Sequence, residues 1–176
     1  MLEGNTVFLD CLEHLSTEAE LRIHISFFYS DSRKSFFACY TGDNMNSELS
    51  FGRKVLQAIE ENGISFEHFP SGIDTMCAVL NSRELSKKRG DIMAAICKAV
   101  NPDNIFTEEN LALIAVVGRG MVKNKGTAAK IFVALANAGV NIRMIDQGSC
   151  ELNIIIGVDE HDYITALEAI YNAFVK

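Results

Sequence analysis

Residues 130–140 read KIFVALANAGV, and residues 54–64, which lie 76 positions earlier, read KVLQAIEENGI. Both stretches begin with Lys, continue with apolar residues at the three- and four-residue spacing of one helix face, and end in Gly and a further apolar residue. Gly adopts the left-handed conformation that ends many helices, so each stretch predicts a helix that stops at its Gly. The chain therefore contains two copies of one structural unit.

The similarity extends outward in both directions at the same offset and without a gap. The identical pairs include Gly42 and Gly118, Met45 and Met121, Lys54 and Lys130, Ala58 and Ala134, Gly63 and Gly139, and Gly72 and Gly148. The apolar pattern between these pairs also agrees. Agreement at so many glycine, turn and helix positions favours duplication over chance.

Each copy predicts the element order β-α-β-β-α. In the first copy, the expected strands are 36–40, 64–69 and 75–80; one helix carries Val55, Leu56 and Ile59, and a second carries Ile92, Ile96 and Ala99 and stops at Asn101-Pro102. In the second copy, the expected strands are 111–117, 140–145 and 151–156; one helix carries Ala128, Ile131, Phe132, Leu135 and Ala138, and the last carries Ile164, Leu167, Ile170, Tyr171 and Phe174. A possible fourth strand of the first copy lies near 104–107.

The second copy has no residues left for a fourth strand, which a βαββαβ unit needs in order to complete its sheet. Residues 22–28 alternate between apolar and polar side chains, as a half-buried strand does. We expect this strand to complete the second copy, so that the domains are 35–108 and 21–30 plus 109–176, with residues 1–20 unassigned. The alternative is an extra strand on the first copy.

Composition and charge exclude several functions. The 176 residues include 16 basic and 23 acidic side chains, for a net charge of −7, which argues against nucleic-acid binding. No apolar run approaches the length that spans a bilayer, and no basic segment with the features of a secretory signal is present, so we expect a cytoplasmic protein. The five Cys and four His residues lack metal-ligand spacing, and we predict no metal, cofactor or catalytic residue.

Two sets of segments resemble the tandem ACT repeats in the regulatory region of aspartokinases. The first set is 51–57 with 62–74, and the second is 111–121 with 138–149. The resemblance covers about residues 35–176, and it implies an α+β fold of two ferredoxin-like βαββαβ units in tandem. Residues 1–20 match nothing in that family, and they are either the end of a preceding kinase domain or the chain's own beginning.

The resemblance implies allosteric regulation rather than catalysis. The phosphate-binding segment of aspartokinases has no counterpart here, and the glycines at 118, 120 and 126 fit neither common phosphate-binding pattern. We therefore expect a regulatory part of an ATP-dependent aspartate kinase, which senses lysine or threonine for feedback control. The implied partners are a free amino acid, the aspartokinase catalytic domain and a second copy in a symmetric dimer.

By matching position, the resemblance implies a set of effector-binding residues. In the first repeat these are Met45, Ser47, Phe51, Gly52, Phe66, Glu67, Ser71, Gly72 and Asp74; in the second they are Met121, Asn141, Ile142 and Gln147. Backbone N–H groups at a helix start would hold the effector's carboxylate. Glu67 or Asp74 would accept its ammonium group.

Other interpretations remain open at the level of sequence. Phe51 and Phe66 also fit ordinary core positions, and Asp74 also suits a turn. Ser47 replaces an Arg that is common in the family, and Asn124-Lys125 and Cys150 are further departures. The alternatives are a stand-alone ACT protein that senses another amino acid, and a dimerisation module without a ligand.

Overall fold

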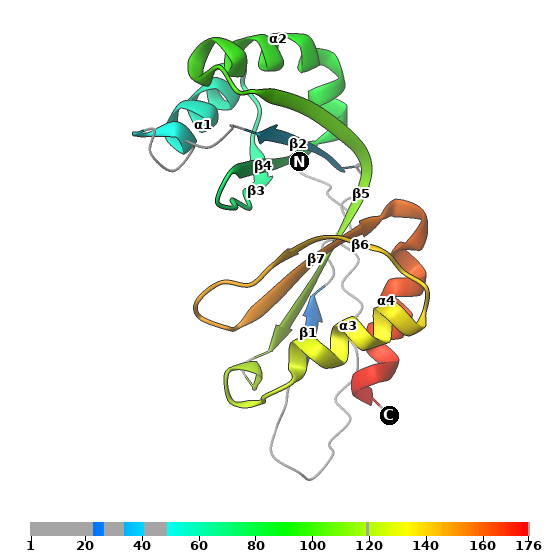
Figure 1. Ribbon diagram of the computed structural model, residues 1–176. Helices are drawn as coiled ribbons and strands as arrows, with labels where there is room; N and C mark the ends of the chain where they lie inside the picture. Colours follow the sequence, from blue (N-terminus) through cyan, green and yellow to red (C-terminus); the bar gives the residue numbers. More distant parts are fainter. Residues whose placement is uncertain (1–22, 27–33, 41–48, 119, 176) are drawn as a thin grey trace, which may run out of the picture. The chain divides into compact units, whose positions relative to one another are not determined.

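The computed structural model describes residues 23–26, 34–40, 49–118 and 120–175. They form two compact units, whose elements are labelled in Figure 1. The first unit comprises Ser32–Leu111, and the second comprises strand β1 and Ala112–Lys176.

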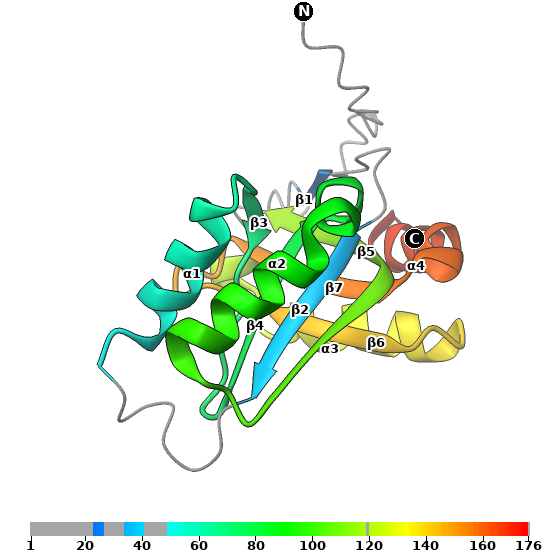
Figure 2. The same ribbon diagram turned by 90° about the horizontal axis from the view of Figure 1, so that it is seen from above.

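The first unit is a four-stranded antiparallel sheet with two helices. Its elements are β2 (Lys34–Tyr40), α1 (Phe51–Glu61), β3 (Phe66–His68), β4 (Thr75–Asn81), α2 (Ser82–Val100) and the first part of β5 (Asn104–Gly118). The strand order is β3-β4-β2-β5. Figure 2 shows α2 lying along β2 and β4, with α1 beside it. The order places the first and third strands of the unit at the centre, as in a ferredoxin-like fold.

The second unit repeats this arrangement with a strand from the beginning of the chain. Its elements are the rest of β5, η1 (Met121–Lys123), α3 (Thr127–Asn137), β6 (Ile142–Asp146), β7 (Asn153–Asp159), η2 (Glu160–Asp162), α4 (Tyr163–Val175) and β1 (Ile23–Ser26). The strand order is β6-β7-β5-β1, and β1 pairs antiparallel with β5 from Ile23 opposite Gly118 to Ser26 opposite Ala115. The predicted fold class and the completion of the second unit by an N-terminal strand are confirmed.

A separate apolar core lies between the helices and the sheet of each unit. In the first unit, Val55 and Ile59 of α1 pack with Ile92 and Ile96 of α2, each at most 1% exposed. In the second unit, the buried side chains include Ile131, Leu135, Ile154, Ile156 and Ile170. The helix faces predicted from the apolar spacing are the faces that carry these cores.

One predicted core position is wrong. Ile164 of α4 is 60% exposed, because Tyr163 and Ala166 take the core positions in the first turn of that helix. Ile170 lies on the same helix face as Tyr163 and Ala166. The buried face of α4 therefore begins at Tyr163, one residue before the position that the sequence pattern indicated.

Both first helices end in the same way. Gly63 and Gly139 have φ angles of 65° and 72°, and the next residues donate backbone hydrogen bonds to carbonyls five positions earlier, Ile64 to Ile59 and Val140 to Leu135. This is the Schellman arrangement that the two glycines predicted. The predicted end of α2 is also confirmed, since the helix stops at Val100 before Asn101 and Pro102.

The offset of 76 residues does not hold throughout the repeat. It relates α1 to α3 and the start of β3 to the start of β6, but β4 and β7 begin at Thr75 and Asn153, which are 78 positions apart. The strand predicted at 151–156 therefore lies at Asn153–Asp159. The extra residues lie in the β6–β7 hairpin, where β6 has five residues and β3 has three, and Glu151 adopts a φ of 53° in its turn.

Strand β5 joins two strands that were predicted separately. The expected strands 104–107 and 111–117 are one element, Asn104–Gly118, which passes through the boundary between the units. Asn110 has a φ of 60° inside it, and the pairing with β2 shifts register opposite this position. A left-handed Asn accommodates such a bulge, so the chain stays in strand conformation on both sides of it.

Gly90 lowers the stability of the middle of α2, and no neighbouring atom leaves too little space for a larger residue there. A Cβ built at Gly90 would meet no atom within 4 Å, and Gly90 is exposed. Because Gly costs roughly 1 kcal/mol relative to Ala in a helix interior, we expect Gly90→Ala to raise the free energy of unfolding by about 0.5–1 kcal/mol. Urea denaturation followed by circular dichroism measures this, and a lower midpoint would contradict it.

Candidate functional site

The start of α1 leaves backbone donors without a side-chain cap. Ser50 precedes the helix with a φ of 66°, and its side chain makes no capping hydrogen bond. No acidic residue lies in the first turn. By contrast, Asn81 caps α2 by accepting a hydrogen bond from the Arg83 N–H at 3.0 Å, and Glu84 follows in its first turn. The start of α1 therefore keeps the positive end of its helix dipole uncompensated by its own side chains.

The start of α3 has the same character at the corresponding place in the second unit. Gly126 lies 76 positions after Ser50 and has a φ of 88°, again without a side-chain cap or an acidic residue in the first turn. The Thr127 hydroxyl instead donates to the Asn124 carbonyl at 3.0 Å, which shapes the preceding loop. Both first helices thus begin after a left-handed residue.

The first turn of α1 contacts β4 just after the turn between β3 and β4. Ser71 bridges to Met76, and a Cβ built at Gly52 of α1 would lie 3.0 Å from Cε of Met76. The Gly72 N–H donates to the Thr75 carbonyl at 2.7 Å, which closes the turn. A Cβ at Gly72 would lie 2.7 Å from Oγ1 of Thr75, so a side chain there would require the Thr75 hydroxyl to move.

Four sequence-predicted residues lie in the β3–β4 turn or in the first turn of α1, and their exposure differs. Ser71, Gly72 and Asp74 are exposed in the turn, whereas Gly52 is half-buried in the first turn of α1. Phe51 is 3% exposed and belongs to the core of the first unit. Its ring therefore packs in the core and anchors the start of α1 there.

The structure does not bring Phe66 and Glu67 into the same turn. Both lie on β3, where Phe66 pairs with Leu80 and the next pair is His68 with Val79. Glu67 is exposed between these pairs, and Phe66 is 47% exposed with its ring centroid 5.7 Å from that of Phe69. These two candidates lie several residues further along the hairpin from α1 than the Ser71–Met76 bridge.

The second-unit candidates are divided between core and surface. Met121 is 5% exposed and packs in the core, and Ile142 is partly buried against the same core. Asn141 and Gln147 are exposed at the two ends of β6. Met45 and Ser47 lie outside the described residues.

Sequence reasoning missed two features of these units. The first is Ser50, whose left-handed backbone opens the start of α1; the glycine at the matching position, Gly126, was the available signal. The second is an ion pair in which Nη1 of Arg143 lies 2.6 Å from Oδ1 of Asp159, with side chains 19% and 29% exposed. No sequence pattern placed these two residues together, because the two extra residues of the β6–β7 hairpin set their register.

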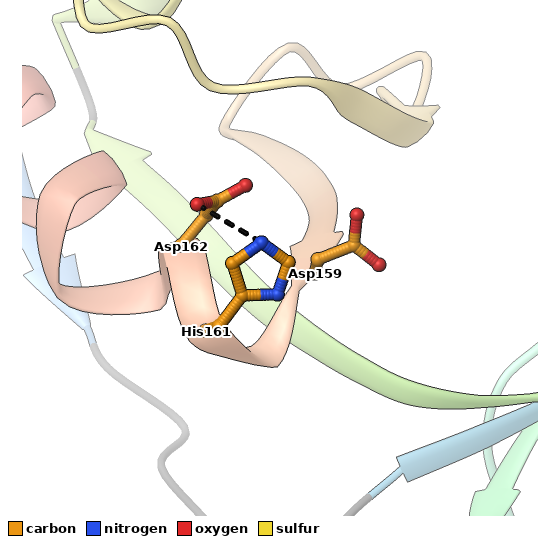
Figure 3. Close-up of side chains that lie close together, drawn as sticks. All are labelled: Asp159, His161 and Asp162. Carbon is orange, nitrogen blue, oxygen red and sulfur yellow. Dashed lines mark ion pairs between the residues drawn. The ribbon is translucent and has the colours of Figure 1, made fainter.

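Asp159, His161 and Asp162 also gather where β7 leads into α4, as Figure 3 shows. One ligand-type atom of each lies within 4.8 Å of the others. Oδ1 of Asp159 is held by Arg143, and Nε2 of His161 lies 3.3 Å from Oδ1 of Asp162. Acidic groups at the start of η2 and α4 also complement the helix dipole, so the cluster has a structural explanation without a metal.

The described residues offer little for covalent chemistry. Burial raises the pKa of the Cys77 thiol, so the thiol stays protonated at neutral pH and is a poor nucleophile.

Among the described residues, no helix combines the length and the apolar character needed to cross a membrane.

The fold agrees with comparisons to known proteins. The family model described as "ACT domain" matches residues 114–174. Aspartokinase 3 of Bacillus subtilis is 41% identical over 131 residues, which are 74% of this chain and 29% of that protein. The aspartate kinase of Clostridium acetobutylicum is 47% identical, with a TM-score of 0.76 over 81% of this chain and 33% of that one.

The chain thus spans about a third of the length of these two relatives. A regulatory subunit of aspartate kinase from Thermus flavus shares the fold over 93% of its own length and 81% of this chain, with a TM-score of 0.68 and 21% identity. This chain therefore matches almost the whole of that regulatory subunit. Over most of its length, the chain is therefore similar to the ACT-domain regulatory regions of aspartokinases.

Proposed function

We propose that this chain is the effector-sensing part of an aspartokinase and that it binds a free amino acid, lysine or threonine, at the start of α1. The uncapped first turn of α1 carries the proposal, together with its contact to β4 just after the exposed turn that holds Asp74. Backbone N–H groups of that helix turn are donors for the effector's carboxylate, and the helix dipole favours its negative charge.

The ammonium group of the effector needs an acceptor near these donors. Asp74 lies in the turn two residues before Met76, the β4 residue whose side chain lies against Gly52 of α1, and Glu67 lies on β3. Either carboxylate forms a charge-assisted hydrogen bond with an ammonium group. Gly72 keeps the backbone of the turn free of a side chain where the ligand would pass.

Regulation follows from a difference in affinity between two states of the attached enzyme. An effector shifts such an equilibrium only by binding one state more tightly than the other. The proposed partners are the aspartokinase catalytic domain and a second copy of this chain. The second-unit candidates Met121, Asn141, Ile142 and Gln147 would form a matching site at the start of α3.

Asp74→Asn tests the acidic turn. We expect isothermal titration calorimetry to give heat with L-lysine or L-threonine, and Asp74→Asn to weaken that binding at least tenfold, because one charge-assisted contact contributes about 1.5–3 kcal/mol. Asp91→Asn is the matched control, since Asp91 is an exposed carboxylate on α2, and it should bind as the wild type does.

The titration also separates the proposal from its alternatives. Heat with a different amino acid favours a sensor of that amino acid. Absence of heat with all twenty favours a dimerisation module and contradicts effector binding.

A further inference from the structure

The exposed faces of the first helices differ in chemistry between the two units. At the offset of 76 residues, Gln57 of α1 corresponds to Val133 of α3, and both side chains are exposed. Three further positions are exposed in both helices, and they pair Arg53 with Ala129, Glu60 with Ala136 and Glu61 with Asn137. The polar face of α1 has therefore become an uncharged and largely apolar face on α3.

The second helices show the same difference in their first turns. Leu85 of α2 and Tyr163 of α4 are buried and lie 78 positions apart, which is the offset that relates β4 to β7. Ser86 therefore corresponds to Ile164, and both of these side chains are exposed. A hydroxyl in the first unit is replaced by a large apolar side chain in the second.

The exposed face of α1 satisfies its own polar groups. Nη1 of Arg53 donates to Oε1 of Gln57 at 2.8 Å, and Nε2 of Gln57 donates to Oε1 of Glu61 at 2.7 Å. By contrast, Val133 is 58% exposed and Ile164 is 60% exposed in the second unit. Exposing such apolar area to water is unfavourable, so this face gains free energy when another surface covers it.

The two apolar side chains belong to one helical layer. Nζ of Lys130 lies 4.8 Å from the centre of the Phe174 ring, so the first turn of α3 lies beside the last turn of α4, as Figure 1 also shows. Lys130 and Glu168 are the charged residues of these helices, and their charges balance. We call the following exposed residues the outer face of the second unit: Ala129, Val133, Ala136, Asn137, Ile164 and Thr165.

We propose that the outer face of the second unit docks on an apolar surface of the aspartokinase catalytic domain, a step that rests on the proposed function. This chain spans only 29% and 33% of the two full-length kinases described above, so most of each enzyme lies outside the matched region. An effector bound to the regulatory part reaches the catalytic part through surfaces at which the two touch. Of the two helical layers, the one in the second unit has the uncharged, apolar character of the centre of a protein interface.

A second copy of the chain has a different surface available to it. Strands β3 and β6 each lie at one edge of their sheets. Such an edge presents unpaired backbone groups that another strand can pair with. The outer face of the second unit consists of helices whose backbone groups are already paired, and it remains accessible for a different partner when the edges pair.

Photo-crosslinking in the cells that make the complete protein tests the docking. Val133 is replaced by p-benzoylphenylalanine, and Gln57, its counterpart in the first unit, is replaced in the matched control. Mass spectrometry then identifies the peptide that is joined to the probe. Ile164 and its counterpart Ser86 form a second pair of positions, which serves if circular dichroism shows that the Val133 variant does not fold.

We expect the probes at positions 133 and 164 to be joined to peptides of the aspartokinase catalytic domain, at least ten times as often as the probes at positions 57 and 86. Crosslinks to α3 or α4 of a second copy, crosslinks to an unrelated protein, or equal yields in the two units would overturn the inference.

Calorimetry keeps a failure of the proposed function separate from a failure of the docking. Val133→Glu should bind lysine or threonine as the wild type does, because residue 133 lies in the second unit and the proposed effector site lies in the first. Absence of heat in the wild type would remove the effector site, whereas crosslinks to the catalytic domain would still support the docking.

Discussion

Deleting residues 1–30 is expected to unfold the second unit while the first unit stays folded. The deletion removes β1, whose four residues pair with Ala115–Gly118 of β5. Four lost strand pairings, at about 1 kcal/mol for each hydrogen bond, amount to several kcal/mol in a domain whose total stability is only about 5–15 kcal/mol. The exposed edge of β5 would also become a site for aggregation.

Deletion of residues 1–20 is the matched control, because it leaves β1 in place. Hydrogen exchange followed by mass spectrometry distinguishes the units, since α3 and α4 should lose protection in the longer deletion while α1 and α2 keep it. Equal protection of α3 and α4 in both deletions would show that β1 contributes little to the sheet.

Leu135→Ala is expected to lower the free energy of unfolding by about 2–5 kcal/mol. Leu135 of α3 is 0% exposed and lies in the core of the second unit with Ile131 and Ile156. Removing its side chain loses the apolar burial and leaves a cavity that the packed neighbours fill only in part.

Val133→Ala on the same helix provides the comparison. Val133 is 58% exposed, so its truncation should change the unfolding free energy by less than about 0.5 kcal/mol. Denaturation curves of both variants measure the difference. Similar losses for Leu135→Ala and Val133→Ala would show that the face of α3 has been assigned wrongly.

The sequence predicts the repeat, its element order and most of the core, because these depend on local periodicity and on glycine. Gly63 and Gly139 mark the helix ends, and Val55 with Ile59 marks the buried face of α1. It does not predict the bulge at Asn110 or the two extra residues before β7. Both depend on the register of strand pairing, which an ungapped comparison of two repeats cannot detect.

The candidate site is predictable in part for the same reason. The turn with Gly72 and Asp74 follows from the hairpin pattern, and β4 just after it contacts Gly52. The burial of Phe51 and the ion pair between Arg143 and Asp159 depend on side-chain packing and on a shifted register. Residue type alone does not decide whether such a residue lies in the core or on the surface.

The origin of β1 affects how the chain folds during its synthesis. Ser26 is synthesised 89 residues before its partner Ala115. At about 5–20 residues per second, β1 waits roughly 4–18 s before its neighbour exists, while the first unit becomes complete in between. Strand β1 must therefore stay unpaired during this time. It must not pair with the exposed strand edges of other chains that are being synthesised on the same messenger RNA.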